Sequence, residues 1–280
     1  MADQMPKPAA PSDTGRLFRE GKLAEAVAAA NAAVRKTPAD VGARVLLAEL
    51  LLFSGNIERA DTVLDACADI DVTAAVMVAE FRQLLRGEIA RRQLFSEGRV
   101  PEFLGEPTAA QRLALAALVA LRDGDAEEAA RLVAQAEEAR IHTAGTGPDG
   151  LFNDMRDGDD VLSTCFEVIT TTGKYFWISP ERVATMEFHP MKRPRDLFWR
   201  RTTMSVNGGP DGEVYLPTIY PPIQGAGKEP DDALRLGRAT DWLQVGDIGP
   251  TRGVGAVTLI VGEEPKTWLE MDSLSFRPEA

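Results

Sequence analysis

The stretch Gly21-Lys-Leu-Ala-Glu-Ala26 returns in the chain as Gly55-Asn-Ile-Glu-Arg-Ala60 and again as Gly124-Asp-Ala-Glu-Glu-Ala129. Gly55 lies 34 positions after Gly21, and Gly124 lies 69 positions after Gly55. A period of 34 residues is typical of tetratricopeptide helical hairpins, in which a glycine ends one helix and a small residue lets the next helix pack closely. The repeat therefore predicts stacked helical hairpins in the first half of the chain.

The sequence around these copies has the periodicity of amphipathic helices. From residue 13 to about residue 140 it is rich in Ala, Leu, Glu and Arg, and apolar residues recur three and four positions apart. The predicted helices cover residues 41–54, 57–68, 73–93, 109–123 and 126–139. Burial of apolar faces is enough to explain such a stack, but a stack can also expose a groove that accepts an amphipathic helix from a partner.

The second half of the chain has a different composition. All four Trp and all three Tyr follow residue 151, together with most of the β-branched runs and the turns that contain Gly or Pro. Strands are predicted at residues 161–170, 175–178, 183–188, 202–206, 213–216, 256–261 and 268–276, and the first of these can equally be the end of a helix. The turn sequence Asn207-Gly-Gly-Pro-Asp-Gly212 predicts a hairpin over residues 202–216.

These patterns predict an α+β fold, with N-terminal tetratricopeptide-like (TPR-like) helical hairpins followed by a mostly antiparallel β-rich domain or partial barrel. Residues 1–12 are predicted to be a flexible N-terminus. The helical domain is expected at residues 13–141 and the β-rich domain at residues 151–280. Between them, residues 142–150 (HTAGTGPDG) contain glycines and a proline that cannot continue a helix, which favours a linker.

Composition also bears on the class of function. The net charge of −12 disfavours binding to nucleic acid or to an anionic membrane surface. No apolar run approaches the roughly 20 residues needed to cross a bilayer, and the first residues do not resemble a secretion signal, so a cytoplasmic location is expected. Cys67 and Cys165 lie in segments of different character, and we interpret both as buried apolar residues.

The sequence shows no familiar catalytic or cofactor motif. Residues 249–255 (GPTRGVG) lack the Lys-Ser/Thr of a phosphate loop, and we interpret them as a turn. His142 and His189 have no companion ligands at the spacing of a zinc site, and no serine lies in a nucleophile elbow. We therefore predict no cofactor, no metal and no catalytic residues.

Two charged stretches remain to be interpreted. The acidic cluster consists of Asp154, Asp157, Asp159 and Asp160. Its spacing fails the pattern of a calcium loop and suits the N-terminus of a helix better than a cation site. The basic stretch at residues 192–201 carries five positive charges and two aromatic residues. It resembles a surface for single-stranded nucleic acid, but salt bridges to the acidic cluster or a protein-facing patch are favoured.

Several long strings carry a family resemblance. They are Leu151-Phe-Asn-Asp-Met-Arg-Asp-Gly-Asp-Asp160, Phe166-Glu-Val-Ile-Thr170, Thr172-Gly-Lys-Tyr-Phe-Trp-Ile178, Lys192-Arg-Pro-Arg-Asp-Leu-Phe-Trp199, Gly212-Glu-Val-Tyr-Leu-Pro217, Leu236-Gly-Arg-Ala-Thr-Asp-Trp242 and, in the first half, Leu94-Phe-Ser-Glu-Gly-Arg-Val-Pro-Glu-Phe-Leu104. In sequence, order and spacing they resemble the TagJ/ImpE family, also called SciE-type virulence proteins. The similarity runs over nearly the whole chain.

The resemblance implies a cytoplasmic accessory protein of the type VI secretion system, and not an enzyme. In some members of the family the protein binds the N-terminal helix of the small sheath subunit, TssB, and is thought to modulate recognition of the sheath by the AAA+ ATPase ClpV. Two alternatives remain at this stage. One is a scaffold for another component of the secretion system, and the other is a metal-dependent hydrolase that uses the acidic cluster.

Candidate partner-binding residues come from the charged and amphipathic positions of these strings. They are Arg193, Arg195, Trp199, Arg238, Asp241 and Trp242. Arg and Trp are frequent anchors at protein interfaces. The same residue types also pack a core or hold two domains together, and this alternative stays open for each position.

Overall fold

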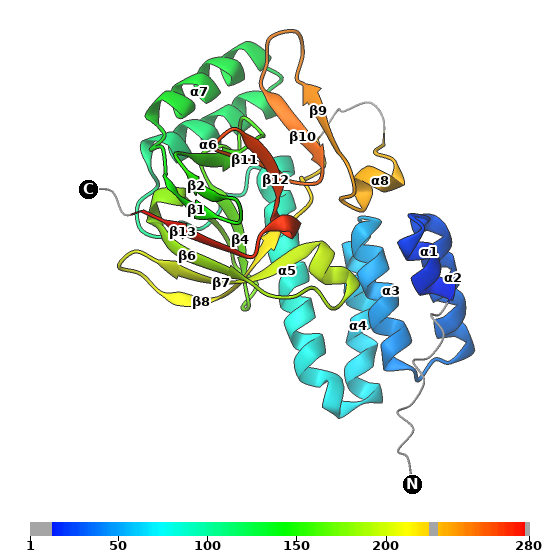
Figure 1. Cartoon of the computed structure of the whole chain (residues 1–280). Helices are drawn as coiled ribbons and strands as arrows, with labels where there is room; N and C mark the ends of the chain where they lie inside the picture. The colour runs from blue at the N-terminus through cyan, green and yellow to red at the C-terminus, as the bar shows by residue number, and fades with distance from the viewer. Residues whose placement is uncertain (1–12, 224–228, 278–280) are drawn as a thin grey trace. The chain divides into compact units, whose positions relative to one another are not determined.

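The computed structural model describes residues 13–223 and 229–277, which form two compact units that divide between Ala75 and Val76 (Figure 1). The predicted flexible N-terminus, residues 1–12, lies outside the described residues. The first unit is helical, and the second combines three long helices with antiparallel sheets. Within the described ranges, no helix is both long enough and apolar enough to cross a membrane.

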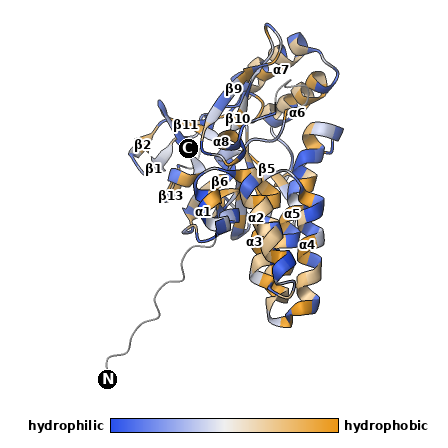
Figure 2. Ribbon diagram, turned by 90° about the vertical axis from the view of Figure 1, so that its right-hand side faces the viewer, coloured by the Kyte–Doolittle hydropathy of each residue, from blue (hydrophilic) through white to orange (hydrophobic). Residues whose placement is uncertain are grey.

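The first unit consists of two helical hairpins. Its helices are α1 (Asp13–Arg19), α2 (Leu23–Lys36), α3 (Val41–Phe53) and α4 (Ile57–Ile70), followed by the short 3-10 helix η1 (Val72–Ala74). Helix α3, most of which is hydrophobic (Figure 2), packs against both α2 and α4, and its last seven residues, 47–53, are all buried. The predicted helices at 41–54 and 57–68 are confirmed within two residues.

The repeated sequence forms the turn inside each hairpin. Gly21 and Gly55 both have φ of +80°, a left-handed conformation that costs glycine little and that ends the preceding helix. Ala26 and Ala60, which close the two copies, are fully buried. A larger side chain at either position would hold the helices apart, so the repeat encodes both the turn and the close packing that follows it.

The second unit contains α5 (Ala75–Glu97), α6 (Ala109–Arg122) and α7 (Ala126–Ala139). The third copy of the repeat lies between α6 and α7, where Gly124 has φ of +79° and the Asp125 side chain accepts a hydrogen bond from the Glu128 N–H. Thr108 and Gln111 form a capping box at the start of α6. The helices predicted at 109–123 and 126–139 are confirmed, and the long helix begins and ends later than predicted.

An eight-stranded sheet forms the centre of the second unit. Its strand order is β2-β1-β13-β6-β7-β8-β4-β5, and all neighbouring strands are antiparallel. These strands are β1 (Gly145–Gly147), β2 (Gly150–Phe152), β4 (Phe166–Thr170), β5 (Tyr175–Ile178), β6 (Val183–Phe188), β7 (Trp199–Val206), β8 (Asp211–Pro217) and β13 (Ser273–Phe276). The predicted hairpin over residues 202–216 is confirmed as β7 and β8.

Two smaller sheets complete this unit. One pairs β9 (Thr240–Gln244) with β10 (Thr251–Gly255), and the other pairs β11 (Thr258–Val261) with both β3 (Met155–Asp157) and β12 (Glu264–Thr267). The remaining elements are short: α8 (Asp232–Arg235) and the 3-10 helices η2 (Pro180–Arg182), η3 (Pro194–Leu197) and η4 (Trp268–Glu270). The predicted mostly antiparallel β-rich part is confirmed.

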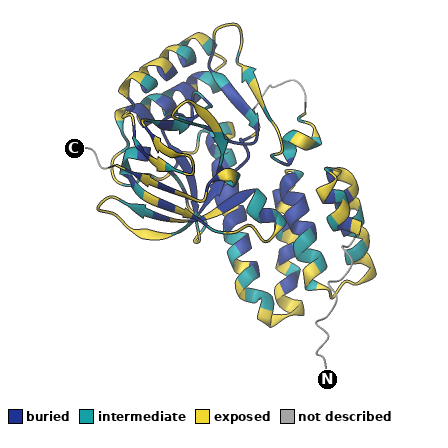
Figure 3. Cartoon of the chain, in the orientation of Figure 1, coloured by how far each residue is buried: buried dark blue, intermediate teal, exposed yellow. Residues whose placement is uncertain are grey.

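Helix α5 packs directly on one face of the large sheet. A Cβ added at Gly87 would lie 2.4 Å from Cγ2 of the fully buried Ile169 on β4, so the helix approaches the sheet where it has no side chain. The ring of Phe81 meets that of Trp199 on β7 edge to face, with centroids 6.1 Å apart. These contacts belong to the buried interior of the unit (Figure 3).

The compact units do not coincide with the division by composition into residues 13–141, 142–150 and 151–280. Helices α5, α6 and α7 belong to the same unit as the sheets. The stretch interpreted as a linker contains β1, which pairs with both β2 and β13. Composition separates helix from strand, whereas the units follow packing, and a helix buried against a sheet belongs with that sheet.

Two local interpretations are wrong. Residues 249–255 are not merely a turn, because Thr251–Gly255 forms β10. This strand has a glycine at position 253 because a Cβ there would come within 2.1 Å of the Tyr220 ring. The glycine therefore reflects close packing and not a bend. The acidic cluster does not precede a helix, because turns follow it and β4 begins at Phe166.

Candidate functional site

Three of the candidate residues lie close together in sequence, Arg193 and Arg195 in the connection between β6 and β7 and Trp199 at the start of β7. Arg193 is exposed. Arg195 is buried, with its guanidinium carbon 4.8 Å from the centroid of the Phe81 ring on α5. Trp199 is also buried, and its indole N–H points to Glu88 at 3.4 Å. Arg195 and Trp199 therefore hold α5 against the sheet, and Arg193 alone of the three is open to a partner.

The rest of the basic stretch makes separate structural contacts. Arg200 is buried, donates to the Met271 carbonyl at 3.2 Å and lies over the ring of Phe188. Arg201 pairs with Glu213 on the neighbouring strand. The predicted salt bridges from this stretch to the acidic cluster are not among the contacts of the described residues. The reason is topological, since guanidinium groups from α7 and β10 reach the acidic residues instead.

The other three candidates cluster on and beside β9. Arg238, Asp241 and Trp242 are all exposed, and 41% of Trp242 is accessible to solvent. The Asp241 carboxylate accepts the Trp242 backbone N–H at 2.9 Å. The indole covers Gly158 and lies 6.0 Å from the ring of Tyr220, centroid to centroid. The hairpin of β9 and β10 thus presents a tryptophan whose inner face is packed and whose outer face is open.

Asp154 is fixed by a guanidinium and a backbone amide. Its two oxygens accept from Arg140 at 2.9 and 2.6 Å, and one also accepts the Thr143 N–H at 3.0 Å. Burial alone would raise the pKa of Asp154, but the hydrogen bonds from Arg140 and from the Thr143 N–H, together with the charge of Arg140, outweigh burial and lower the pKa. The carboxylate therefore joins the end of α7 to the segment that enters the sheet.

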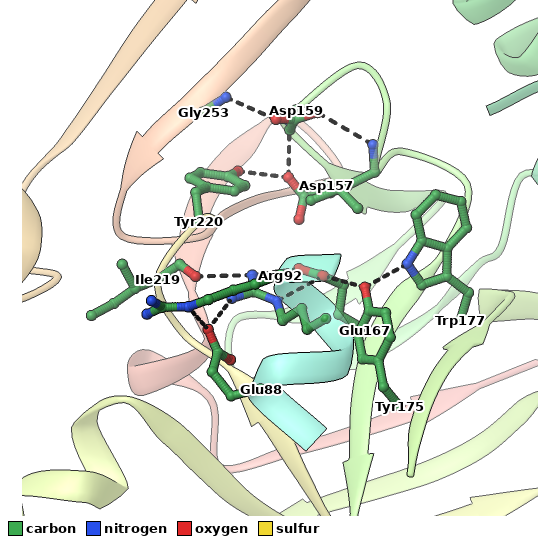
Figure 4. A network of polar contacts seen from close by, with 12 residues as sticks. Glu88, Arg92, Asp157, Asp159, Glu167, Tyr175, Trp177, Ile219, Tyr220 and Gly253 are labelled. Carbon is green, nitrogen blue, oxygen red and sulfur yellow. Dashed lines mark hydrogen bonds and ion pairs between the residues drawn. The ribbon is translucent and has the colours of Figure 1, made fainter. Parts of the chain in front are cut away.

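Two of the other three carboxyl groups, those of Asp159 and Asp160, hold the β9–β10 hairpin. Asp159 is fully buried and accepts from Arg252 Nε at 2.7 and 2.9 Å and from the Gly253 N–H at 2.9 Å. Asp160 accepts the Thr251 N–H at 2.7 Å. Asp157 accepts the Tyr220 hydroxyl at 2.6 Å (Figure 4). Within the described ranges, no group of three or more His, Cys, Asp or Glu residues is arranged to hold a metal ion.

Sequence reasoning missed a second buried network, which joins α5 to the sheet. Arg91 binds Glu167 on β4 with two hydrogen bonds of 2.8 and 2.7 Å. Tyr175 donates to Glu167 at 2.5 Å and accepts the Trp177 indole N–H at 2.7 Å (Figure 4). A glutamate inside the apolar string FEVIT was the available signal, because a buried carboxylate requires a partner.

Electrostatics favour the charged form of Arg91 and the neutral form of Tyr175. Burial by itself lowers the pKa of Arg91, but the carboxylates of Glu167 and Glu88 outweigh burial and raise it above the usual value. Burial raises the pKa of Tyr175, and the adjacent Glu167 charge raises it further, so the phenol stays protonated and donates. The arrangement is that of a structural ion pair with every polar end occupied, and it presents no free nucleophile or general base.

Comparisons with known proteins match each part of the chain. A tetratricopeptide repeat model matches residues 17–76, and the model of the ImpE protein matches residues 149–275. The type VI secretion system accessory component TagJ of Pseudomonas aeruginosa is 30% identical over 230 residues, which cover 82% of this chain and 80% of that protein.

A solved structure supports the same assignment. The crystal structure of a protein from Vibrio parahaemolyticus superposes with a TM-score of 0.87 at 26% identity, covering 95% of this chain and 98% of that one. The repeat match ends where the first compact unit ends, and the ImpE match lies inside the second. The chain therefore belongs to the TagJ/ImpE family of type VI secretion accessory proteins.

Proposed function

We propose that this protein is a non-enzymatic, cytoplasmic adaptor that binds the N-terminal helix of the small contractile-sheath subunit, a TssB-like protein. Through that contact it modulates how a ClpV-type AAA+ ATPase recognises the sheath. Contact with the ATPase itself is indirect in this proposal. The observation that carries it is the coincidence of a tetratricopeptide match with a separate compact helical unit, in a chain similar to a type VI secretion accessory component.

The helical unit supports a role in binding a helix. Stacked hairpins present helix faces side by side, and tetratricopeptide arrays use such faces to accept amphipathic helices or extended peptides. The turns of this unit are held by Gly21 and Gly55, and α3 and α4 begin at side-chain caps, Asp40 on the Ala43 N–H and Asn56 on the Arg59 N–H. Such a preformed surface lowers the entropy cost of binding.

The chemistry of the second unit supports a non-enzymatic role. The acidic cluster, the main candidate for catalysis, is engaged with Arg140, Arg252, Tyr220 and backbone amides. A hydrolase would need these carboxylates to converge on an accessible cation or water. The exposed residues Arg193, Arg238, Asp241 and Trp242 stay in the proposal as candidate contacts with a protein partner.

Titration of the purified chain with a labelled peptide tests the proposal. The peptide copies the N-terminal helix of the cognate small sheath subunit, and anisotropy is compared with that of a scrambled peptide. We expect saturable binding with Kd near micromolar, which corresponds to about −8 kcal/mol. Absence of binding at tens of micromolar contradicts the proposal, and a pull-down would then identify the component that this protein serves as a scaffold.

A further inference from the structure

The end of β3 and the turn that follows it bury two carboxyl groups beside one guanidinium. Asp159 is fully buried, and Asp157 is 6% exposed. Arg252, itself 4% exposed, gives Nε to both oxygens of Asp159, which also accepts the N–H groups of Gly253 and Val161. The charge of Asp159 is therefore matched. Asp157 instead receives the Tyr220 hydroxyl at 2.6 Å and the Asp159 N–H at 2.8 Å, both of which are neutral donors.

Several other charged and titratable groups surround Asp157. They are Arg156 beside it on β3, Asp159 and Asp160 in the turn, Cys165 before β4, Glu167 on β4 with its partner Arg91 on α5, Tyr220 and, on β10, Arg252. Arg156 is about one third exposed and extends toward Glu137 on α7. Arg91 is committed to Glu167 and Glu88. Among the described residues no hydrogen bond or ion pair joins the Asp157 carboxyl group to a guanidinium, so its charge has no matched cation.

We propose that the folded protein holds Asp157 as a neutral carboxylic acid, and that this proton closes residues 157–162 onto the β9–β10 hairpin. Moving a second carboxylate into this buried site would oppose the charge of Asp159 at close range. A proton on Asp157 removes that repulsion. It also preserves the contacts that Asp159 and Asp160 make to the backbone of Gly253 and Thr251.

The hydrogen bonds around Tyr220 accommodate a protonated neighbour. Its hydroxyl lies 2.6 Å from Oδ1 of Asp157 and 3.2 Å from the Thr258 carbonyl, and it accepts the Thr258 N–H at 3.1 Å. When Asp157 carries the proton, its O–H donates to Tyr220, and Tyr220 donates to Thr258. When Asp157 is ionised, Tyr220 donates to the carboxylate, and the Thr258 carbonyl keeps only the Gly158 N–H at 2.8 Å. The protonated arrangement therefore makes one more hydrogen bond, to a carbonyl that already accepts one.

The electrostatic shifts agree with this geometry. Burial raises the pKa of Asp157 well above its usual value, and the adjacent Asp159 charge raises it further. Burial and the neighbouring Asp157 also raise the pKa of Tyr220, so the phenol does not ionise in the range where Asp157 does. A raised folded-state pKa means that the folded chain binds a proton that the unfolded chain has released. Stability therefore falls as pH rises from the unfolded pKa to the folded one.

Urea unfolding of the full chain between pH 5 and 9 tests this inference with Asp157→Asn, which keeps the shape of the neutral acid. Relative to the variant, the unfolding equilibrium constant of the unaltered chain should rise about tenfold per pH unit until Asp157 ionises in the folded state. The control is Glu128→Gln. Its profile should run parallel to that of the unaltered chain in this range, because the pKa of Glu128 is lowered and its ion-pair partner, Arg131, stays charged throughout.

Two further readouts keep the inference decisive. The Gly253 N–H donates a hydrogen bond to Asp159. Its hydrogen-exchange rate should be higher in the unaltered chain than in Asp157→Asn at pH 9, and the two rates should be equal at pH 6. If the variant does not fold, the carboxyl carbon resonance of Asp157 in the unaltered protein decides the question. An ionised Asp157 at pH 6, or parallel stability profiles for the unaltered chain and Asp157→Asn, would overturn the proposal.

Discussion

The two buried polar networks of the second unit balance charge in different ways. Where α5 meets the sheet, Glu88 and Glu167 are matched by Arg91 and Arg92, and the phenol of Tyr175 serves only to complete the hydrogen bonds. At the end of β3 and in the turn that follows, Asp159 is paired with Arg252, whereas Asp157 accepts only from neutral donors. The comparison shows two routes by which a buried acid becomes tolerable, a matched cation in one case and a proton in the other.

Removing the matched cation should have the largest effect. Arg91→Met leaves Glu167 buried with only the Tyr175 hydroxyl as donor, and we expect a loss of about 3–5 kcal/mol in the free energy of unfolding. Urea unfolding at pH 7 measures it. The double variant Arg91→Met with Glu167→Gln should recover a large part of the loss, because the uncompensated charge is gone. A loss below about 1 kcal/mol in the single variant would contradict the assignment of this pair as a buried ion pair.

Filling the two glycines beside the networks should have an intermediate and unequal effect. A methyl group at Gly87 meets the fully buried Ile169, so overpacking of about 1–3 kcal/mol exceeds the gain of about 1 kcal/mol that Ala brings to a helix. A Cβ added at Gly158 would lie 2.6 Å from the indole of Trp242, which is partly exposed and has room to move. It would also lie 3.0 Å from the Thr258 carbonyl oxygen, a much less severe approach than the 2.4 Å at Gly87. We expect Gly158→Ala to cost less than Gly87→Ala, as compared by thermal unfolding. The opposite order would mean that the hairpin is the more rigid of the two.

Breaking the Arg140 contact at the sheet entrance should have the smallest effect. The Asp154 side chain is 24% exposed, and we expect Asp154→Asn to cost about 1 kcal/mol at pH 7. Because the folded-state pKa of Asp154 is lowered, the stabilisation is present above the unfolded pKa of about 3.9 and is lost as pH falls through the folded value. Unfolding curves of variant and unaltered chain should therefore converge in acid. A gap that persists at pH 2 would assign the effect to packing.

The elements that could be predicted from sequence are those set by local rules. A left-handed glycine followed by a capping side chain and a buried alanine ends one helix and begins the next without help from distant residues, as at Gly55, Asn56 and Ala60. The same holds for β5 and β6, which the β-branched and aromatic runs located within a residue. These features depend on neighbours along the chain, which a sequence displays.

What could not be predicted depends on distant contacts. Arg195 and Trp199 share a string with the exposed Arg193, and only the position of Phe81 on another element separates their roles. The sequence did not predict β10, because its glycines are typical of a turn. Gly253 is instead required by close packing against Tyr220, more than thirty residues earlier in the chain. The family resemblance located the strings that matter but did not separate their buried residues from their exposed ones.

All four tryptophans lie in the second unit, so intrinsic fluorescence reports on that unit. Trp177, Trp199 and Trp268 are buried within the second unit, whereas Trp242 is 41% exposed, and the first unit contains none. A water-soluble quencher should therefore dim the emission of the β9–β10 hairpin selectively, while the helical hairpins stay dark in fluorescence and contribute mainly to far-ultraviolet circular dichroism. Tryptophan fluorescence thus reports on the second unit alone, without a label, whereas helices of both units contribute to circular dichroism.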